Sequence, residues 1–228
     1  MTTVLITGAN RGLGLELTRQ YAAAGDSVLA CCRDPSDASA LNELAAANSR
    51  VKVHGVKITD AASVAALAKA IGSTPIDILI NNAGTAAPAK QSLAEMDYEG
   101  WMEAFATNTM APFRMVQTFR ENLKASGGRI ANITSQFGAL SFDTPYVYAY
   151  SATKAALNKV MRLAAIELGK EGINSVIIHP GWVQTDMGGP QGQQTPQESA
   201  TGIRAVLASL NAESNGSFVK WNGEAHAW

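Results

Sequence analysis

A tyrosine and a lysine stand four residues apart in the stretch YVYAYSATK, which covers residues 146–154. On a helix, Tyr150 and Lys154 would share one face. A phenol has an ordinary pKa of about 10, too high for easy proton exchange at neutral pH, and an adjacent ammonium lowers that pKa by favouring the phenolate. The pair is therefore a candidate acid–base group. Neither Tyr146 nor Tyr148 has a cation four residues later.

The elements that would position this pair follow a regular alternation along the chain. Apolar runs rich in β-branched residues cover 3–7, 27–32, 51–56, 76–80, 129–134, 174–178 and 216–219. Helical patterns lie between them, at 12–24, 37–48, 61–71, 92–106, 112–125, 150–169 and 196–210. This alternation predicts right-handed crossovers and helices on both faces of the sheet. We expect one doubly wound, Rossmann-type α/β domain over residues 1–228, with a mainly parallel seven-stranded sheet.

The composition is typical of one ordered domain. Of 228 residues, 46% are apolar and 16% are charged, which predicts a large core. The net charge of −1 gives no electrostatic reason to expect nucleic acid or an anionic membrane as a partner. The apolar runs are shorter than the roughly 20 residues of a membrane span, and the N-terminal sequence lacks the pattern of a signal peptide.

The cysteines and histidines predict neither a disulfide nor a metal site. Cys31 and Cys32 are adjacent, so on a strand they would point to opposite faces and could not form an unstrained bridge. We expect both to be reduced, as in a cytoplasmic protein. His54, His179 and His226 are too scattered to suggest metal ligands.

The first predicted strand runs into a glycine-rich turn, TGANRGLG, at residues 7–14. Glycine permits a tight turn and lets backbone N–H groups approach a pyrophosphate at the start of a helix. Such a turn alone also fits an ordinary connection, but its place after the first strand of an α/β chain favours a dinucleotide site. The residues predicted to contact the dinucleotide here are Gly8, Asn10, Arg11, Gly12, Leu13 and Gly14.

The end of the second predicted strand bears on which dinucleotide binds. An acid at this place would bind the free 2′-hydroxyl of an adenosine ribose. Here Arg33 follows the strand, and Arg11 lies in the glycine turn. Planar guanidinium groups bind phosphate through paired hydrogen bonds, so the sequence favours NADP(H) over NAD(H). Asp34 leaves NAD(H) open, because its carboxylate could turn inward and accept from the ribose.

The segment GGPQGQQT, at residues 188–195, is the least regular part of the chain. It follows the carboxyl end of the sixth predicted strand, where α/β proteins place their ligands. We expect a mobile substrate loop over residues 188–200.

The ordered motifs together resemble the short-chain dehydrogenase/reductase family over essentially the whole chain. The matching segments are TGANRGLG (7–14), NNAG (81–84), Asn108 in NTMAPF, NITS (132–135), YSATK (150–154) and HPGWVQTD (179–186). Two further segments, TPQESATGI and GSFVKWNGEAHAW, are most similar to small carbonyl reductases related to the sniffer protein and to the C-factor signalling proteins.

This resemblance implies a catalytic set of four residues. Tyr150 would be the general acid in reduction and the base in the reverse reaction. Lys154 would lower the pKa of Tyr150 and hydrogen-bond the nicotinamide ribose. Ser135 would donate a hydrogen bond to the substrate oxygen, and Asn108 would hold a water that links Lys154 to solvent.

The resemblance also implies cofactor contacts beyond the glycine turn. The loop after the sixth strand would meet the nicotinamide carboxamide through the backbone near Val183 and the Thr185 hydroxyl. The full set of these further contacts is Asn81, Ala83, Gly84, Tyr150, Lys154, Pro180, Gly181, Val183 and Thr185. One position departs from the family pattern, because Lys57 stands where the family usually has an acid that contacts adenine. Lys57 would add positive charge near the nucleotide.

Four large side chains flank the motifs and could form the wall of a substrate pocket, namely Phe137, Tyr146, Trp182 and Met187. They favour a small apolar ketone, aldehyde or quinone as the substrate of an NADPH-dependent carbonyl reductase. The alternatives are an NAD-dependent secondary-alcohol dehydrogenase and a nucleotide-binding signalling protein of the C-factor type. The family resemblance further implies a homodimer or homotetramer built through helices near 92–125 and 150–169.

Overall fold

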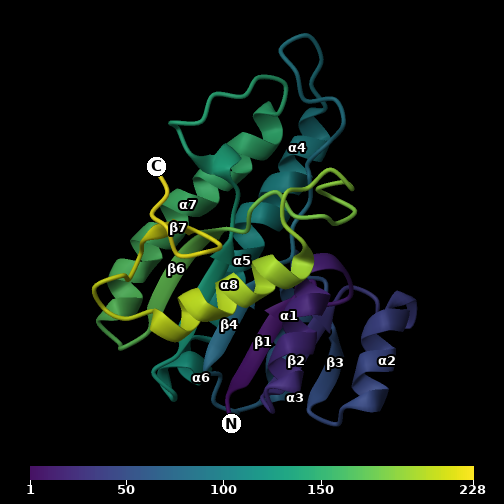
Figure 1. Cartoon of the computed structure of the whole chain (residues 1–228), viewed down its shortest axis with the longest axis vertical. Helices are drawn as coiled ribbons and strands as arrows, with labels where there is room; N and C mark the ends of the chain where they lie inside the picture. Colours follow the sequence, from purple (N-terminus) through teal and green to yellow (C-terminus); the bar gives the residue numbers. More distant parts are fainter.

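The computed structural model describes residues 1–228 and contains one parallel sheet of seven strands (Figure 1). The strands are β1 (Thr3–Thr7), β2 (Ser27–Cys32), β3 (Val51–Gly55), β4 (Ile78–Asn81), β5 (Arg129–Ile133), β6 (Asn174–His179) and β7 (Phe218–Lys220). Their order is β3-β2-β1-β4-β5-β6-β7, and every neighbouring pair is parallel. The order reverses between β1 and β4, which is where doubly wound sheets open a ligand-binding crevice. The predicted fold class is confirmed.

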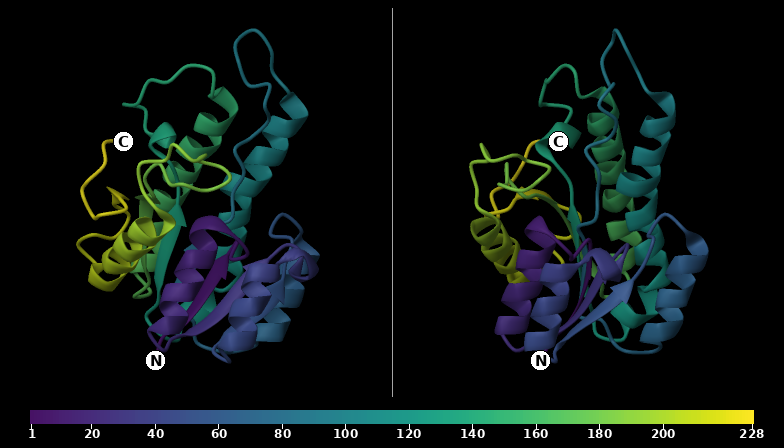
Figure 2. Two further views of the ribbon diagram at one scale, coloured as in Figure 1. Left: turned by 45° about the vertical axis from the view of Figure 1, so that its right-hand side comes forward. Right: turned by 90° about the vertical axis from the view of Figure 1, so that its right-hand side faces the viewer.

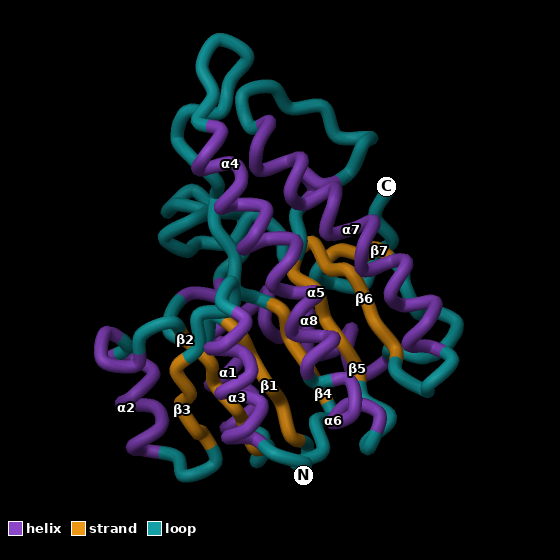
Figure 3. Tube along the Cα trace, turned by 180° about the vertical axis from the view of Figure 1, so that it is seen from behind, coloured by secondary structure: helices purple, strands orange, loops and turns teal.

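Helices cover both faces of this sheet (Figures 2 and 3). One face carries α1 (Gly12–Ala23), α2 (Ser39–Ala47) and α8 (Pro196–Ser209). The other face carries α3 (Ala61–Ile71), α5 (Ala111–Thr118), α6 (Arg120–Lys124) and α7 (Tyr148–Gly169). Helix α4 (Tyr98–Phe105) leads into α5 through a π-helical turn, η2 (Ala106–Met110), and two short 3₁₀ turns follow strands, η1 (Pro35–Asp37) and η3 (Gln136–Gly138).

The core forms two layers because side chains alternate along each strand. In β1, Val4 and Ile6 pack with α1, α2 and α8, whereas Leu5 packs with the helices on the opposite face. All three are fully buried. A strand that is buried on both faces has a continuous apolar sequence, which is the pattern that predicted a parallel sheet.

Two helix boundaries differ from the prediction. Helix α4 begins at Tyr98 rather than near residue 92, because Asp97 accepts a hydrogen bond from Gly100 N at 2.9 Å and caps the helix there. Residues 85–97 form an irregular loop instead. Helix α8 begins at Pro196, capped by a reciprocal pair between Thr195 and Glu198. The predicted loop over 188–200 therefore overlaps α8, and only residues up to 195 are non-helical.

None of the helices combines the length and hydropathy needed to cross a membrane.

Candidate active site

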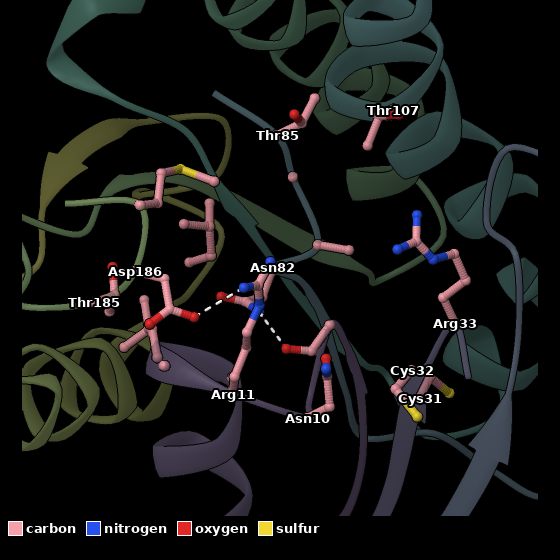
Figure 4. Close-up of a pocket in the computed structure, with 18 of the residues that line it drawn as sticks. Asn10, Arg11, Cys31, Cys32, Arg33, Asn82, Thr85, Thr107, Thr185 and Asp186 are labelled. Atoms are coloured by element: carbon pink, nitrogen blue, oxygen red, sulfur yellow. Dashed lines mark hydrogen bonds and ion pairs between the residues drawn. The ribbon is translucent and has the colours of Figure 1, made fainter. Parts of the chain in front are cut away.

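A cleft of about 710 Å³ runs along the carboxyl ends of the central strands (Figure 4). Its lining joins segments that are far apart in sequence, because parallel strands all end at the same edge of the sheet. The predicted cofactor residues that line it are Gly8, Asn10, Arg11, Gly12, Leu13, Gly14, Arg33, Ala83, Gly84, Lys154, Pro180, Gly181, Val183 and Thr185. No group of three or more potential metal-ligating side chains gathers in the structure.

The turn between β1 and α1 needs its glycines. Gly8 and Gly12 have φ of 67° and 52°, a conformation that other residues rarely adopt. A Cβ at Gly14 would collide with the Gly8 carbonyl oxygen and lie 2.5 Å from Asn82 Nδ2. The turn therefore brings the backbone at Gly14 close to that at Gly8.

The first turn of α1 has no capping group of its own. Arg11 occupies the cap position with extended backbone, its side chain makes no capping hydrogen bond, and the first turn contains no acid. The N–H groups of that turn are thus free to bind an anion, and the helix dipole favours one there.

Asn82 ties the glycine turn to the segment after β4. Its Nδ2 donates to Thr7 O at 2.9 Å and to Gly8 O at 3.1 Å. Thr7 Oγ1 accepts from the backbone N of Asn82 and Ala83 at 3.0 and 3.1 Å. These bonds fix the two backbone segments that form the floor of the cleft.

The far end of the cleft, beside β2, is lined by two basic and two acidic side chains, Arg33, Lys57, Asp34 and Asp37. Arg33 extends along this wall in Figure 4, and Lys57 also lines it. The Asp34 carboxylate is engaged locally, since it accepts from Ser36 N at 2.9 Å and from Ser36 Oγ at 2.6 Å. These bonds to Ser36 lower the pKa of Asp34 below its ordinary value.

Arg11 spans the mouth of the cleft. Its Nη1 lies 2.8 Å from Asp186 Oδ2, in the loop after β6 (Figure 4). Both side chains are about three-quarters exposed, at 72% and 75%, so the pair adds little stability. An anion in the cleft would compete with Asp186 for this guanidinium.

Tyr150 and Lys154 lie on one face of α7, as their spacing predicted. Lys154 Nζ stands 5.8 Å from the centre of the Tyr150 ring and donates to Ile133 O at 2.9 Å. Burial disfavours the ammonium and lowers the pKa of Lys154 to about 8. Ser135, which follows β5, is the side chain that interacts with the phenol.

The comparisons with known proteins agree with this geometry. The sequence profile of the family described as short chain dehydrogenase matches residues 2–196. The chain belongs to the short-chain dehydrogenase family. It is 36% identical to the C-signal protein of Myxococcus xanthus over 165 residues, which are 72% of this chain and 99% of that protein.

Solved structures of the family superpose closely on the chain. An NADPH-bound carbonyl reductase from chicken fatty liver has a TM-score of 0.93 and 34% identity, covering 100% of this chain and 99% of that one. The carbonyl reductase Sniffer of D. melanogaster has a TM-score of 0.91 and 28% identity, covering 100% of both chains. As a short-chain dehydrogenase, the protein is an oxidoreductase, and the similarity to sniffer-type and C-factor-type proteins is confirmed.

The effect of Lys154 on the pKa of Tyr150 in this short-chain dehydrogenase stays a prediction. The Lys154 ammonium donates to the Ile133 carbonyl, and burial lowers its own pKa. Burial raises the pKa of Tyr150 above its ordinary value, and the Ser135 side chain opposes this rise. The phenol is therefore protonated at neutral pH.

Asn81 does not lie where the cofactor contact was predicted. It is 3% exposed, and its Nδ2 donates to Asn132 Oδ1 at 2.9 Å in the core between β4 and β5. Asn82 lines the cleft instead. Strand alternation explains the difference, because Asn81 is the last residue of β4 and Asn82 begins the turn.

Asn108 is fully buried on the π-helical turn η2, a feature that often occurs at functional sites. Its Oδ1 accepts from Thr85 N at 2.8 Å, and its Nδ2 donates to Thr85 O at 2.9 Å and to Thr153 Oγ1 at 3.0 Å. Both amide hydrogens are thus used within the protein, and only a lone pair on Oδ1 remains for the predicted water. A Cβ at Gly84 would lie 3.2 Å from that oxygen and 3.7 Å from Lys154 Nζ.

The predicted pocket wall is partly assembled. Trp182 and Met187 line the cleft, and the Phe137 ring meets the Tyr150 ring edge to face at 6.0 Å between centroids. Tyr146 is 73% exposed and lies outside the cleft lining. Phe142, which the motifs did not indicate, packs against Phe137 at 5.5 Å.

The loop after β6 is tied at its base. Gln184 N donates to Gln194 O at 2.9 Å, and Gln194 N donates to Trp182 O at 3.0 Å. Trp182 Nε1 also donates to Gly188 O at 2.6 Å. Residues 182–194 therefore fold on themselves beside the cleft. The mobility of this loop stays a prediction.

Proposed function

We propose that the protein is an NADPH-dependent carbonyl reductase whose substrate is a small apolar ketone, aldehyde or quinone. The observation that carries the proposal is the Tyr150 phenol beside Ser135 and 5.8 Å from Lys154 Nζ, a lysine that lines the same cleft as Arg33. The similarity to an NADPH-bound carbonyl reductase supports it. NADPH oxidation with a panel of ketones, aldehydes and quinones is the test, and a chain that oxidises none of them would contradict it.

The chemistry divides between the cofactor and the chain. Bound NADPH supplies the hydride. The chain must then protonate the oxygen that gains charge, and Tyr150 Oη holds that proton because burial raises its pKa. Ser135 donates to the same oxygen, and the Lys154 ammonium orients the nicotinamide ribose. Since the phenol is protonated at neutral pH, we expect reduction to be faster there than alcohol oxidation, which needs the phenolate.

The preference for NADPH rests on the two residues after β2. Asp34 is held by Ser36, so its carboxylate is not turned toward a ribose hydroxyl. The Arg33 side chain forms no ion pair with any acid, which leaves its guanidinium for a 2′-phosphate.

Arg33→Ser is therefore expected to weaken NADPH binding about tenfold and to leave NADH binding unchanged, since a hydrogen bond to a charged group contributes about 1.5–3 kcal/mol. Isothermal titration with both cofactors measures this. Arg50→Ser, an exposed arginine outside the cleft, is the control. A wild-type protein that binds NADH more tightly than NADPH would contradict the cofactor preference and favour the NAD-dependent alcohol dehydrogenase.

Gly14→Ala tests the phosphate end of the cleft. The added methyl collides with the Gly8 carbonyl and must displace the turn. We expect NADPH binding to weaken by about ten- to a hundredfold and stability to fall by about 1–3 kcal/mol. Titration with NADPH and thermal unfolding measure the two effects. Ala24→Ser, at the other end of α1, should change neither; a Gly14→Ala protein that binds NADPH normally would place the phosphates elsewhere.

A nucleotide-binding signalling role is the second candidate, favoured by the similarity to C-signal. Such a role needs the nucleotide cleft but no proton donor. Signalling that persists in a Tyr150→Phe chain would support it.

We also propose a homodimer or homotetramer built through α4 and α7. Both helices expose apolar side chains, namely Tyr98, Met102, Leu163 and Ile166. Light scattering coupled to size-exclusion chromatography tests this, and a monomer at micromolar concentration would contradict it.

A further inference from the structure

Side chains bind both main-chain polar groups of Tyr150, and the one that binds its N–H comes from a distant segment. Gln91 Oε1 accepts from Tyr150 N at 2.9 Å. The Tyr150 carbonyl accepts from Thr153 Oγ1 at 2.8 Å, and that hydroxyl accepts from Asn108 Nδ2 at 3.0 Å. Asn108 in turn is bonded to both main-chain groups of Thr85. The Tyr150 N–H is therefore bound from outside α7, and its carbonyl is bound by a residue of α7 that Asn108 contacts.

Gln91 supplies a hydrogen bond that α7 lacks within itself. The first N–H groups of a helix have no intrahelical acceptor, and Val147, at the cap position, makes no side-chain capping bond. Tyr150 is the third residue of α7, so its N–H is one of these groups. Gln91 reaches it from the loop between β4 and α4, which rises to the same end of the molecule as the start of α7 (Figures 1 and 2).

The Gln91 Nε2 group donates to carbonyls of the loop that contains Gln91. Nε2 donates to Ala86 O at 3.2 Å and to Pro88 O at 2.8 Å. Between these carbonyls lies Ala87, whose φ of 66° is uncommon for a residue with a side chain. Gln91 is only 9% exposed. A single buried amide thus fixes a strained loop and joins it to the helix end that carries the phenol.

We propose that Gln91 is a positioning residue that acts through the Tyr150 main chain and sets where the phenol stands relative to Ser135. This inference rests on the proposed role of Tyr150 as proton donor. Without an acceptor for its N–H, the first turn of α7 would fray and the phenol would shift. A displacement of about 1 Å at a reacting group can cost about a hundredfold in rate.

Three variants separate the acceptor from the loop bonds. Gln91→Met removes both, whereas Gln91→Glu keeps an acceptor for Tyr150 N and loses the donors. Lys90→Met makes the same replacement one residue earlier, at an exposed side chain that bonds only Glu95. We expect Gln91→Met to lower kcat by about ten- to a hundredfold with NADPH affinity within about twofold of wild type. Gln91→Glu should recover most of that loss, and Lys90→Met should equal wild type.

Hydrogen exchange at the Tyr150 amide tests the inference without turnover. The amide should be protected in wild type and in Gln91→Glu, and should exchange much faster in Gln91→Met. If wild type reduces no carbonyl, the proposed function fails while this measurement still applies. Gln91→Asn, whose amide is one methylene shorter, replaces the Met variant if that variant does not fold. Wild-type kcat and protection in Gln91→Met, or a Gln91→Glu chain as impaired as Gln91→Met, would overturn the proposal.

Discussion

Replacing Tyr150 by phenylalanine is expected to lower kcat for carbonyl reduction by about a thousandfold, because the oxygen that receives charge loses its proton donor. The ring and its edge-to-face contact with Phe137 remain, so the fold should be unchanged. NADPH oxidation under saturating substrate measures the loss.

The control for this variant is Tyr148→Phe. Tyr148 lies in the same first turn of α7 and is 43% exposed, so removing its hydroxyl should leave kcat unaltered. Equal turnover in Tyr150→Phe and wild type would mean that another group delivers the proton. NADPH affinity should stay within about threefold of wild type in both variants, which separates loss of proton transfer from loss of binding.

Replacing Lys154 by methionine is expected to raise stability while lowering activity. Burial lowers the pKa of Lys154 from 10.5 to about 8, so the folded protein holds this ammonium at a cost. That cost is on the order of 3 kcal/mol at neutral pH, and the lost bond to Ile133 O offsets about 1 kcal/mol of the gain. A net gain of about 2 kcal/mol corresponds to a rise in Tm of about 5 °C. We expect kcat to fall about a hundredfold.

The pH dependence of this gain has a definite sign. Between pH 8 and 10.5 the unfolded chain binds more protons at Lys154 than the folded chain, so the unfolding free energy of wild type rises with pH in that window. The burial cost is fully present below about pH 8. The Tm difference between Lys154→Met and wild type should therefore be largest near pH 7 and shrink toward pH 10. Lys159→Met, on the exposed side of α7, should show no gain at any pH.

The strands could be predicted from sequence because burial on both faces leaves an uninterrupted apolar run, as in Val4, Leu5 and Ile6. Most of the predicted cofactor residues line one cleft because parallel strands end at the same edge of the sheet. The start of α4 was misplaced because residues 92–97 have a helical composition but Asp97 supplies the cap. Asn81 was predicted at the cleft in place of Asn82 because a motif does not show at which residue the strand ends.

Other features depend on three-dimensional contacts that no local pattern carries. The pKa of Tyr150 depends on burial and on where the Lys154 ammonium points, and spacing along a helix gives neither. Gln91 stands far from α7 in sequence, and a glutamine in a loop has no distinctive signal. The hydrogen bond from Ser36 to Asp34 likewise cannot be predicted from the sequence, because it depends on the positions of both side chains.

The central claim is hydride transfer from NADPH with Tyr150 as the proton donor. Its most direct test traces deuterium from the cofactor to the alcohol product. Wild-type protein would be incubated with NADPH deuterated at the transferable position of the nicotinamide and with a small apolar carbonyl from the panel. We predict one deuterium on the former carbonyl carbon of the alcohol product, and about a thousandfold less of this product in the same time with Tyr150→Phe. Cofactor oxidation without deuterium in the alcohol, or equal labelled product from both proteins, would contradict the account.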